Sequence, residues 1–206
     1  MNDLHKIEAF IILDYSGKRV FAKYFQTPFE QVQQQQEKES KTSSSSSTSA
    51  VKLPFATIQS QLDFEKLIKS KVVTPDGDGP ITTAEGDIML CEGHIVVFHR
   101  DAELLFFTVG PSYENELVLS TVQATIIDSL SQLLNIQNAF DKRNLLENFF
   151  ILALVLDEVI DDGMVLEVSV SNVVQEVAPY AQPDNQAADG AKKALKSLNK
   201  YLKQNL

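Results

Sequence analysis

The chain has 206 residues, 44% of them hydrophobic, and a formal net charge of −10 at pH 7. This length and composition indicate one domain of ordinary size with a sizeable core, and they exclude a chain that is disordered throughout. The acidic balance argues against general binding to nucleic-acid phosphates, which depends on Lys and Arg.

The N-terminal segments predict a β-hairpin. Residues 7–14 (IEAFIILD) are apolar on both faces, as in a central strand that is covered on both sides. A turn at 15–18 (YSGK) leads into a second strand over 19–25 (RVFAKYF). We expect these two strands to pair with each other.

A polar insertion follows the hairpin. Residues 31–50 contain five Gln, seven Ser and two Thr. Such a segment has too little apolar surface to offset the entropy of ordering it. We therefore expect a disordered loop over about residues 30–52, which interrupts a single domain spanning residues 1–178.

A helix and a three-stranded meander come next. Residues 58–68 carry a rough helical stripe that Ser60 or Asp63 could cap, and a loop rich in Gly and Pro covers 74–86. The strand candidates after this loop are 87–91, 94–100 and 103–110. Their two-residue connections are long enough only for hairpins, so the three strands form an antiparallel meander.

Two apolar helices are predicted after the meander. Ser112 can cap the first, whose apolar positions recur every three or four residues. Its stripe consists of Leu119, Val122, Ile126, Leu130 and Leu133. The second helix covers about 141–160 and is apolar all round, so every side of it needs cover, and another protein can supply part of it. We expect Phe150, Ile151 and Leu154 to contact that partner.

The second helix ends in LDEVIDDG (156–163), with four carboxylates in eight residues. A calcium loop with Gly163 at the glycine position fails at three ligands. Asp157 and Asp161 share a helix face, but no histidine, nucleophile or Gly-rich loop accompanies them as catalytic partners. The pattern favours a helix C-terminus stopped by Gly163. Anions are unfavourable there, so we expect backbone N–H groups or a basic residue, from this chain or a partner, to hold Asp157 or Asp161.

The C-terminal part predicts a short helix, a linker and a basic tail. Ser169 can cap a brief helix after an extended segment at 164–168, and prolines mark a linker over 179–190. Residues 191–206 have the spacing of an amphipathic helix with five Lys residues. The candidate contact residues of this tail are Lys192, Lys196, Leu195, Leu198 and Tyr201. The tail suits an acidic groove on a partner, a membrane surface or this chain's own acidic domain.

The sequence contains no motif for a metal, a cofactor or catalysis. His94 and His99 lie an odd number apart on one strand and point to opposite faces, His5 lies near the N-terminus, and Cys91 suits a small core residue. A single cysteine fits a reducing compartment. The first residues lack a signal-peptide pattern, and the longest apolar run, 149–156, is too short for a bilayer. We expect a soluble cytosolic protein without cofactors.

Four blocks of the sequence resemble a known family. They are residues 10–25, 96–110, 112–119 and 145–167. The most specific are I-L-D-x-x-G-K-R-x-x-A-K-Y near the start and L-D-E-V-I-D-D-G-M-V-L-E near the end. They are similar to the zeta subunits of coatomer and, more distantly, to the small (sigma) subunits of clathrin adaptors. The resemblance covers about residues 5–30 and 60–178.

The resemblance implies an α+β fold of the longin type: a five-stranded antiparallel sheet packed by helices, in the order ββ-α-βββ-αα plus a short C-terminal helix. It also implies a non-catalytic structural subunit of the coatomer (COPI) vesicle coat, working in Golgi-to-ER retrograde and intra-Golgi transport. Its partner would be the trunk of the gamma-type large subunit within the heptameric coat. It would be cytoplasmic and peripheral on Golgi membranes and coated vesicles, with no nucleic acid, metal or nucleotide bound.

Two departures limit what the resemblance carries over. Val168 and Ser169 stand where the family usually has Ser or Thr and then Asp, although Ser169 can still cap a helix. No motif allows the dileucine-signal binding of some sigma subunits to be assigned to residues here. The alternative is a longin-type small subunit of a clathrin adaptor or a tethering complex. A hydrolase using Asp157 and Asp161 is a more remote third hypothesis.

Overall fold

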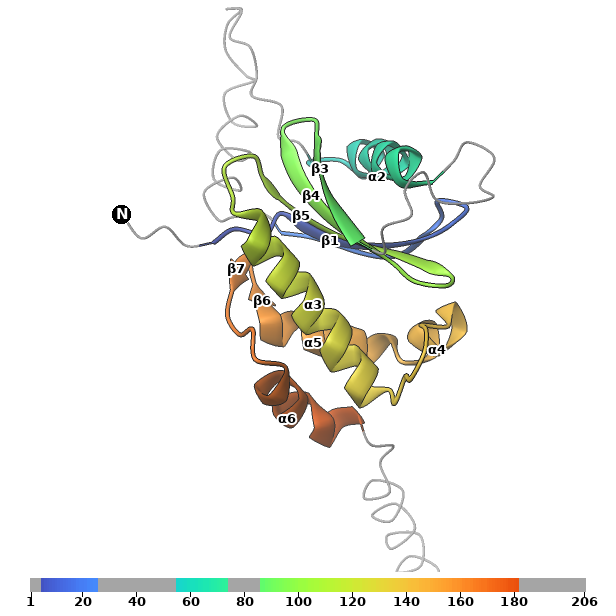
Figure 1. Ribbon diagram of the computed structural model, residues 1–206, viewed down its shortest axis with the longest axis vertical. Helices are drawn as coiled ribbons and strands as arrows, with labels where there is room; N and C mark the ends of the chain where they lie inside the picture. Colours follow the sequence, from blue (N-terminus) through green and yellow to red (C-terminus); the bar gives the residue numbers. More distant parts are fainter. Residues whose placement is uncertain (1–4, 26–54, 74–85, 182–206) are drawn as a thin grey trace, which may run out of the picture.

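The protein is represented by a computed structural model, which describes residues 5–25, 55–73 and 86–181. The expected disordered loop at 30–52 and the basic tail at 191–206 lie outside these residues. The described residues form a five-stranded antiparallel sheet with helices on both of its faces (Figure 1).

The strand order in the sheet is β2-β1-β5-β4-β3. The strands are β1 (Ala9–Asp14), β2 (Arg19–Tyr24), β3 (Gly86–Cys91), β4 (His94–Arg100) and β5 (Leu104–Pro111). The predicted hairpin and meander are both confirmed, since β1 pairs with β2 and the other three pair in sequence. β1 joins the two groups by pairing with β5, with Ile11 opposite Phe107.

The helices lie in two layers. Among the described helices, α2 (Ile58–Val72) packs on one side of the sheet, which we call the α2 face. The helices α3 (Glu116–Leu133), α5 (Phe149–Val159) and α6 (Val170–Ala181) pack together on the other side, which we call the three-helix face (Figure 1). A short helix, α4 (Lys142–Glu147), leads into α5.

β1 is covered on both faces, as its continuous apolar sequence predicts. Phe10 and Ile12 are buried in the core of the three-helix face. The alternate residues Ile11 and Leu13 are buried in the core of the α2 face. The sheet is therefore the shared wall of two separate hydrophobic cores.

Both expected N-caps of the long helices are wrong. α2 is capped by Thr57, whose hydroxyl accepts from a backbone N–H of the first turn, and not by Ser60 or Asp63. α3 is capped by the side chain of Asn115, three residues after the expected Ser112. In each case another residue with a capping side chain stands close to the expected one, so composition alone does not select between them.

The expected helix over 141–160 is two helices. α4 ends and α5 begins at Asn148, which has φ −108° and ψ 27°. Its side-chain amide donates to the backbone carbonyl of Asn144 at 2.9 Å. A side chain that bonds to nearby backbone groups competes with the helical ladder, which accounts for the break at this residue.

The last described helix extends further than its prolines predict. α6 includes Pro179 and is described as far as Ala181, so residues 179–181, which were expected to begin the linker, are helical. Proline is disfavoured inside helices because it lacks a backbone donor, yet Pro179 lies within α6. Val173 and Val177 of α6 are buried, one turn apart, against the three-helix core.

Candidate functional site

The acidic segment at 156–163 is a helix end followed by a β-hairpin. α5 ends at Val159, and β6 (Ile160–Asp161) then pairs antiparallel with β7 (Met164–Val165). Asp157 is therefore helical and Asp161 is in a strand, which corrects the expectation that they share a helix face. The catalytic-pair hypothesis loses its geometric basis at this point.

Gly163 turns the hairpin and does not terminate the helix. Asp162 and Gly163 have φ values of 45° and 84°, as the two central residues of a type I′ turn require. The Gly163 carbonyl accepts a hydrogen bond from the Ile7 amide at 2.7 Å, and a Cβ atom on Gly163 would lie 2.6 Å from the Ile7 carbonyl oxygen. The glycine thus allows the hairpin to lie directly against the N-terminal strand segment.

The carboxylate at the end of α5 has a basic partner within the chain. Lys23 of β2 pairs with Asp157, which is unfavourably placed at the negative end of the helix dipole. Asp161 and Asp162 are exposed. The expectation that a basic residue holds one of these acids is thus confirmed for Asp157. Among the described residues, no group of three or more His, Cys, Asp or Glu side chains is placed to hold a metal ion.

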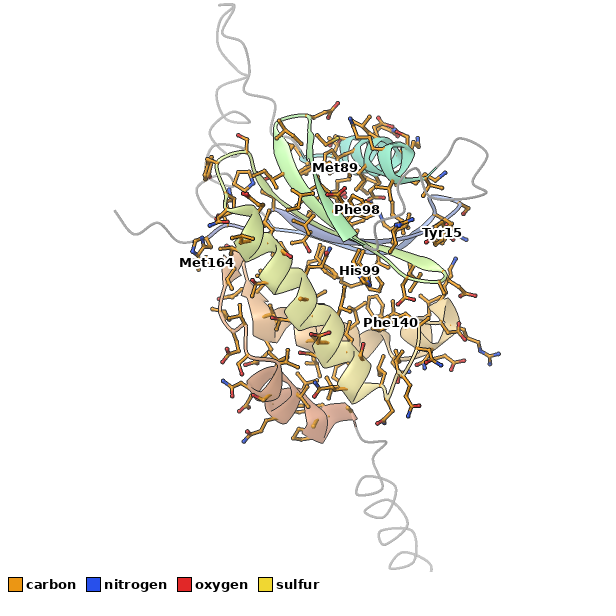
Figure 2. All side chains as sticks on the ribbon, viewed as in Figure 1. Tyr15, Met89, Phe98, His99, Phe140 and Met164 are labelled. Atoms are coloured by element: carbon orange, nitrogen blue, oxygen red, sulfur yellow. The ribbon has the colours of Figure 1, made fainter. Side chains whose placement is uncertain are left out.

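The histidines of β4 lie on opposite faces, as predicted. His94 packs against the rings of Phe55 and Phe64 on the α2 face. His99 packs against Phe106 on the three-helix face, with centroids 6.2 Å apart. Figure 2 labels His99 beside Phe98, its neighbour along the strand. Because the two side chains lie on opposite faces of the sheet, they cannot bind the same ligand.

The three predicted partner-contact residues on α5 differ in their solvent exposure. Phe150 is 60% exposed, Leu154 is half-buried against the core, and Ile151 is only 5% exposed. Ile151 is therefore not available to a partner, which corrects that assignment. The apolar sequence around α5 is explained largely within the chain, because α3 and α6 both pack on this helix. The prediction missed that cover, since α6 lies beyond the helix in sequence.

Two further apolar residues within four positions of Phe150 are exposed. Leu146 at the end of α4 and Phe149 at the start of α5 are each 48% exposed, and we call these three residues the α4–α5 patch. The Phe149 ring also contacts Phe21 of β2, with centroids 5.5 Å apart. Of these three residues, the sequence predicted only Phe150 as a partner contact.

The three-helix face is strongly acidic. Residues 112–141 and 144–181 contain no Lys or Arg, and they contain eleven Asp and Glu residues. Lys142 and Arg143 at the start of α4 are the basic residues that separate these two stretches. α2 on the opposite face carries Lys66, Lys69 and Lys71. A partner that covers the three-helix face would need basic side chains around an apolar centre.

The strand order, the two helical layers and the hairpin after α5 define a small chain of the clathrin-adaptor type. A family model described as "Clathrin adaptor complex small chain" matches residues 6–183. Coatomer subunit zeta-1 of Bos taurus is 35% identical over 175 residues, which cover 85% of this chain and 78% of that protein. The corresponding human protein is 34% identical over the same shares of each chain, and coatomer subunit zeta of Saccharomyces cerevisiae is 28% identical.

The chain therefore belongs to the coatomer zeta family, within the wider family of adaptor small chains. A chain of a homology model of the full-length AP-3 complex in a stretched open conformation aligns with 91% of this chain, at 18% identity and a TM-score of 0.46. That likeness is too low to carry weight. The assignment rests on the family match and the relatives.

Proposed function

We propose that this chain is a non-catalytic structural subunit of a coatomer (COPI) coat and pairs with the trunk of the gamma-type large subunit. The coat acts in Golgi-to-ER retrograde and intra-Golgi transport, and the chain is cytoplasmic and peripheral on Golgi membranes. Membership of the coatomer zeta family supports the coat role. Within the described residues, no helix is both long enough and apolar enough to cross a bilayer.

The α4–α5 patch is the observation that supports pairing through the three-helix side. Contiguous exposed aromatic and aliphatic side chains mark interaction surfaces, and Phe residues contribute large contact areas to them. Phe149 and Phe150 are adjacent, and the Lys142 and Arg143 side chains lie at the start of the same α4–α5 unit. We place the partner contact on Leu146, Phe149 and Phe150, with Leu154 at its edge.

Co-expression with a gamma-type trunk tests this pairing. The full chain should co-purify with the trunk, and Phe150→Ser together with Phe149→Ser should weaken binding by about thirtyfold or more, as loss of a central hot spot does. Ile58→Ser is the matched control, because Ile58 is 70% exposed on the opposite face. A full chain that remains a monomer and shows no affinity for the trunk would contradict the proposal.

The same purification distinguishes the coatomer hypothesis from the alternative. A small subunit of a clathrin adaptor or a tethering complex would co-purify from cytosol with a different large subunit. The family model is shared with adaptors, so this outcome is a real competitor. Identification of the co-purifying large chain by mass spectrometry decides between the two.

A further inference from the structure

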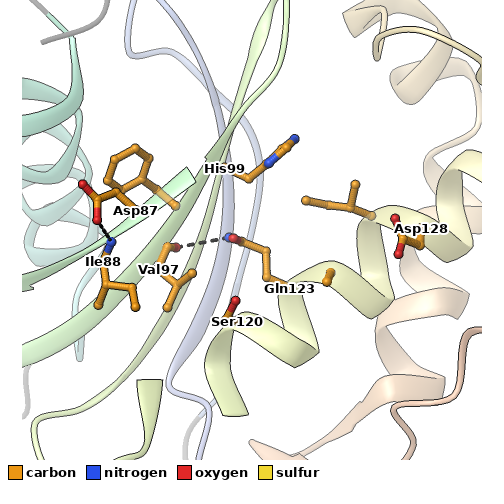
Figure 3. Close-up of a pocket in the computed structure, with 10 residues that line it drawn as sticks. Asp87, Ile88, Val97, His99, Ser120, Gln123 and Asp128 are labelled. Atoms are coloured by element: carbon orange, nitrogen blue, oxygen red, sulfur yellow. Dashed lines mark hydrogen bonds between the residues drawn. The ribbon is translucent and has the colours of Figure 1, made fainter. Parts of the chain in front are cut away.

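A groove runs between the edge strand β3 and helix α3 on the three-helix face (Figure 3). Its volume is about 420 Å³. Val97, Ala124 and Ile127 supply apolar lining, and Ile88 of β3 is 44% exposed at its edge. The small side chains of Ser120 and Ala124 leave space on the α3 side.

At the base of the groove, the buried side-chain amide of Gln123 connects α3 to the sheet. Gln123 is 4% exposed, and its Nε2 donates to the carbonyl oxygens of Val97 at 3.1 Å and Phe106 at 3.2 Å. Figure 3 shows this side chain reaching from α3 towards the sheet. Because Gln123 bonds to two neighbouring strands, the separation of α3 from β4 and β5 is fixed, and the groove is preformed.

The groove is acidic as well as apolar. Asp128 of α3 lines it, and none of the ten described residues around it is Lys or Arg. Asp87 of β3 lies at its edge, but it stands opposite Phe98 in the strand pair, so its side chain is on the α2 face. His99 is the remaining titratable side chain in the lining. The helices of this face also carry negative charge, since α3, α5 and α6 contain acidic residues and no Lys or Arg. The groove therefore suits an amphipathic segment with apolar residues on one side and basic residues beside them.

The chain itself contains a segment of that chemistry. Residues 191–206 carry five Lys and no acidic residue, so the rest of the chain has a net charge of −15. Their apolar residues recur every three or four positions: Ala191, Ala194, Leu195, Leu198, Tyr201 and Leu202. We propose that residues 191–206 dock as an amphipathic helix in the groove between β3 and α3, with Leu195 and Leu198 inward and Lys192 and Lys196 towards Asp128.

The length of the intervening chain permits this docking. α6 packs on α3 and ends at Ala181. Residues 182–190 span up to about 30 Å when extended, and the 18 residues of α3 are about 27 Å long. A segment that starts at residue 191 can therefore reach any position along α3. Because the segment is tethered, its local concentration near the groove is on the order of millimolar.

Amide chemical shifts of the full chain test the docking. We expect Leu195→Ser with Leu198→Ser, and separately Lys192→Glu with Lys196→Glu, to shift the same backbone amides at Ile88, Ala124 and Asp128. Asn199→Ala is the control within the tail and should leave them unchanged. Ala124→Lys alters the groove from its own side, at an exposed position, and should release the tail and give the signals of the tail variants.

Zero-length carbodiimide cross-linking gives a second measurement. The full chain should form a cross-link between Lys192 or Lys196 and Asp128. Asp128→Asn should reduce that cross-link, whereas Asp63→Asn on the α2 face should not. Raising the salt from 0.1 M to 1 M should weaken docking, because the screening length falls from about 10 Å to about 3 Å.

Three outcomes would overturn the proposal. If no tail variant changes the chemical shifts of the groove amides, the tail does not dock there. Cross-links that appear only at high protein concentration would place the tail of a second copy in the groove. Tail variants that leave the groove signals unchanged but abolish binding to phosphatidylcholine–phosphatidylserine vesicles would assign the tail to a membrane surface.

Discussion

The two faces of the sheet are held by different kinds of contact. On the three-helix face, α3, α5 and α6 share a mainly apolar core with β1 and β5. On the α2 face, one described helix packs on a smaller core and is also fixed by charged and aromatic contacts to the sheet. We infer that a single helix needs directional contacts to define its position, whereas three helices define one another's positions by packing.

Glu65 is the centre of the polar contacts under α2. It is 2% exposed, and it accepts from Arg19 Nε at 3.0 Å and from the Tyr24 hydroxyl at 2.8 Å. A second guanidinium nitrogen of Arg19 lies 2.6 Å from the carboxylate, close enough for charge pairing but without hydrogen-bond alignment. Burial and the nearby carboxylate raise the pKa of Tyr24 above its ordinary value. The network joins α2 to the edge strand β2.

Removing Glu65 should have the largest effect on stability. Glu65→Ala leaves Arg19 without its partner, and we expect a loss of about 4 kcal/mol in the free energy of unfolding. Equilibrium urea denaturation measures it. Asp63→Ala on the exposed side of α2 is the matched control, with a change of about 0.5 kcal/mol or less. Equal, small losses in the two variants would show that packing alone positions α2.

The corresponding test of the three-helix face compares two neighbouring residues. Ile151→Ala should cost about 3 kcal/mol, because it leaves a cavity in a packed core. Phe150→Ala should change stability by about 0.5 kcal/mol, since that ring is mainly exposed. Thermal and urea unfolding of both variants measure the difference. A large loss at Phe150 would mean that the α4–α5 patch stabilises the isolated chain and is not reserved for a partner.

Gly163 tests the close approach between the hairpin and the N-terminal segment. Gly163→Ala should cost about 2 kcal/mol, from its positive φ and from contact with the Ile7 carbonyl. Gly93→Ala is the control, because Gly93 has φ +83° and no atom of the described residues lies within 4 Å of its added Cβ. That variant should lose only the conformational contribution, about 1 kcal/mol. Equal losses of stability in the two variants would show that the contact with the Ile7 carbonyl contributes nothing measurable.

The free energy of unfolding should depend on pH through Asp14. Burial alone would raise its pKa, but hydrogen bonds from Lys142, Ser16 and the Lys18 amide outweigh burial and hold the pKa at about 2. The folded-state pKa is lowered, so the stabilisation is present above pH 4 and is lost as the pH falls towards 2. We expect about 2 kcal/mol from this group. Asp14→Asn should flatten the stability curve over that range, and an unchanged curve would contradict the assignment.

The pair between Lys23 and Asp157 should have the smallest effect. Both side chains are more than one-third exposed, and exposed ion pairs contribute between about 0 and 1 kcal/mol. Lys23→Ala should therefore lower stability only slightly, and less at high salt. Urea denaturation at two salt concentrations measures this. A loss comparable to that of Glu65→Ala would show that the pair is central to the link between β2 and α5.

The sequence allowed the sheet to be predicted because its strands are locally encoded. The apolar run of β1 and the two-residue turns of the meander depend only on near neighbours. The break at Asn148 was missed because apolar residues continue on both sides of it. The burial of Ile151 was missed because α6, one of the helices that pack on α5, begins nineteen residues later in the chain. The pairing of Lys23 with Asp157 joins residues 134 positions apart, which no local pattern contains.

The contact between Gly163 and Ile7 also sets the order in which this protein can fold during synthesis. β1 leaves the ribosome before its neighbour β5, which follows about a hundred residues later. The hairpin that binds Ile7 emerges later still, some 156 residues after it. An apolar strand that waits for such distant contacts is slow to fold and exposed to aggregation. Nascent zeta-type chains are therefore expected to depend on chaperones until residue 165 has been made.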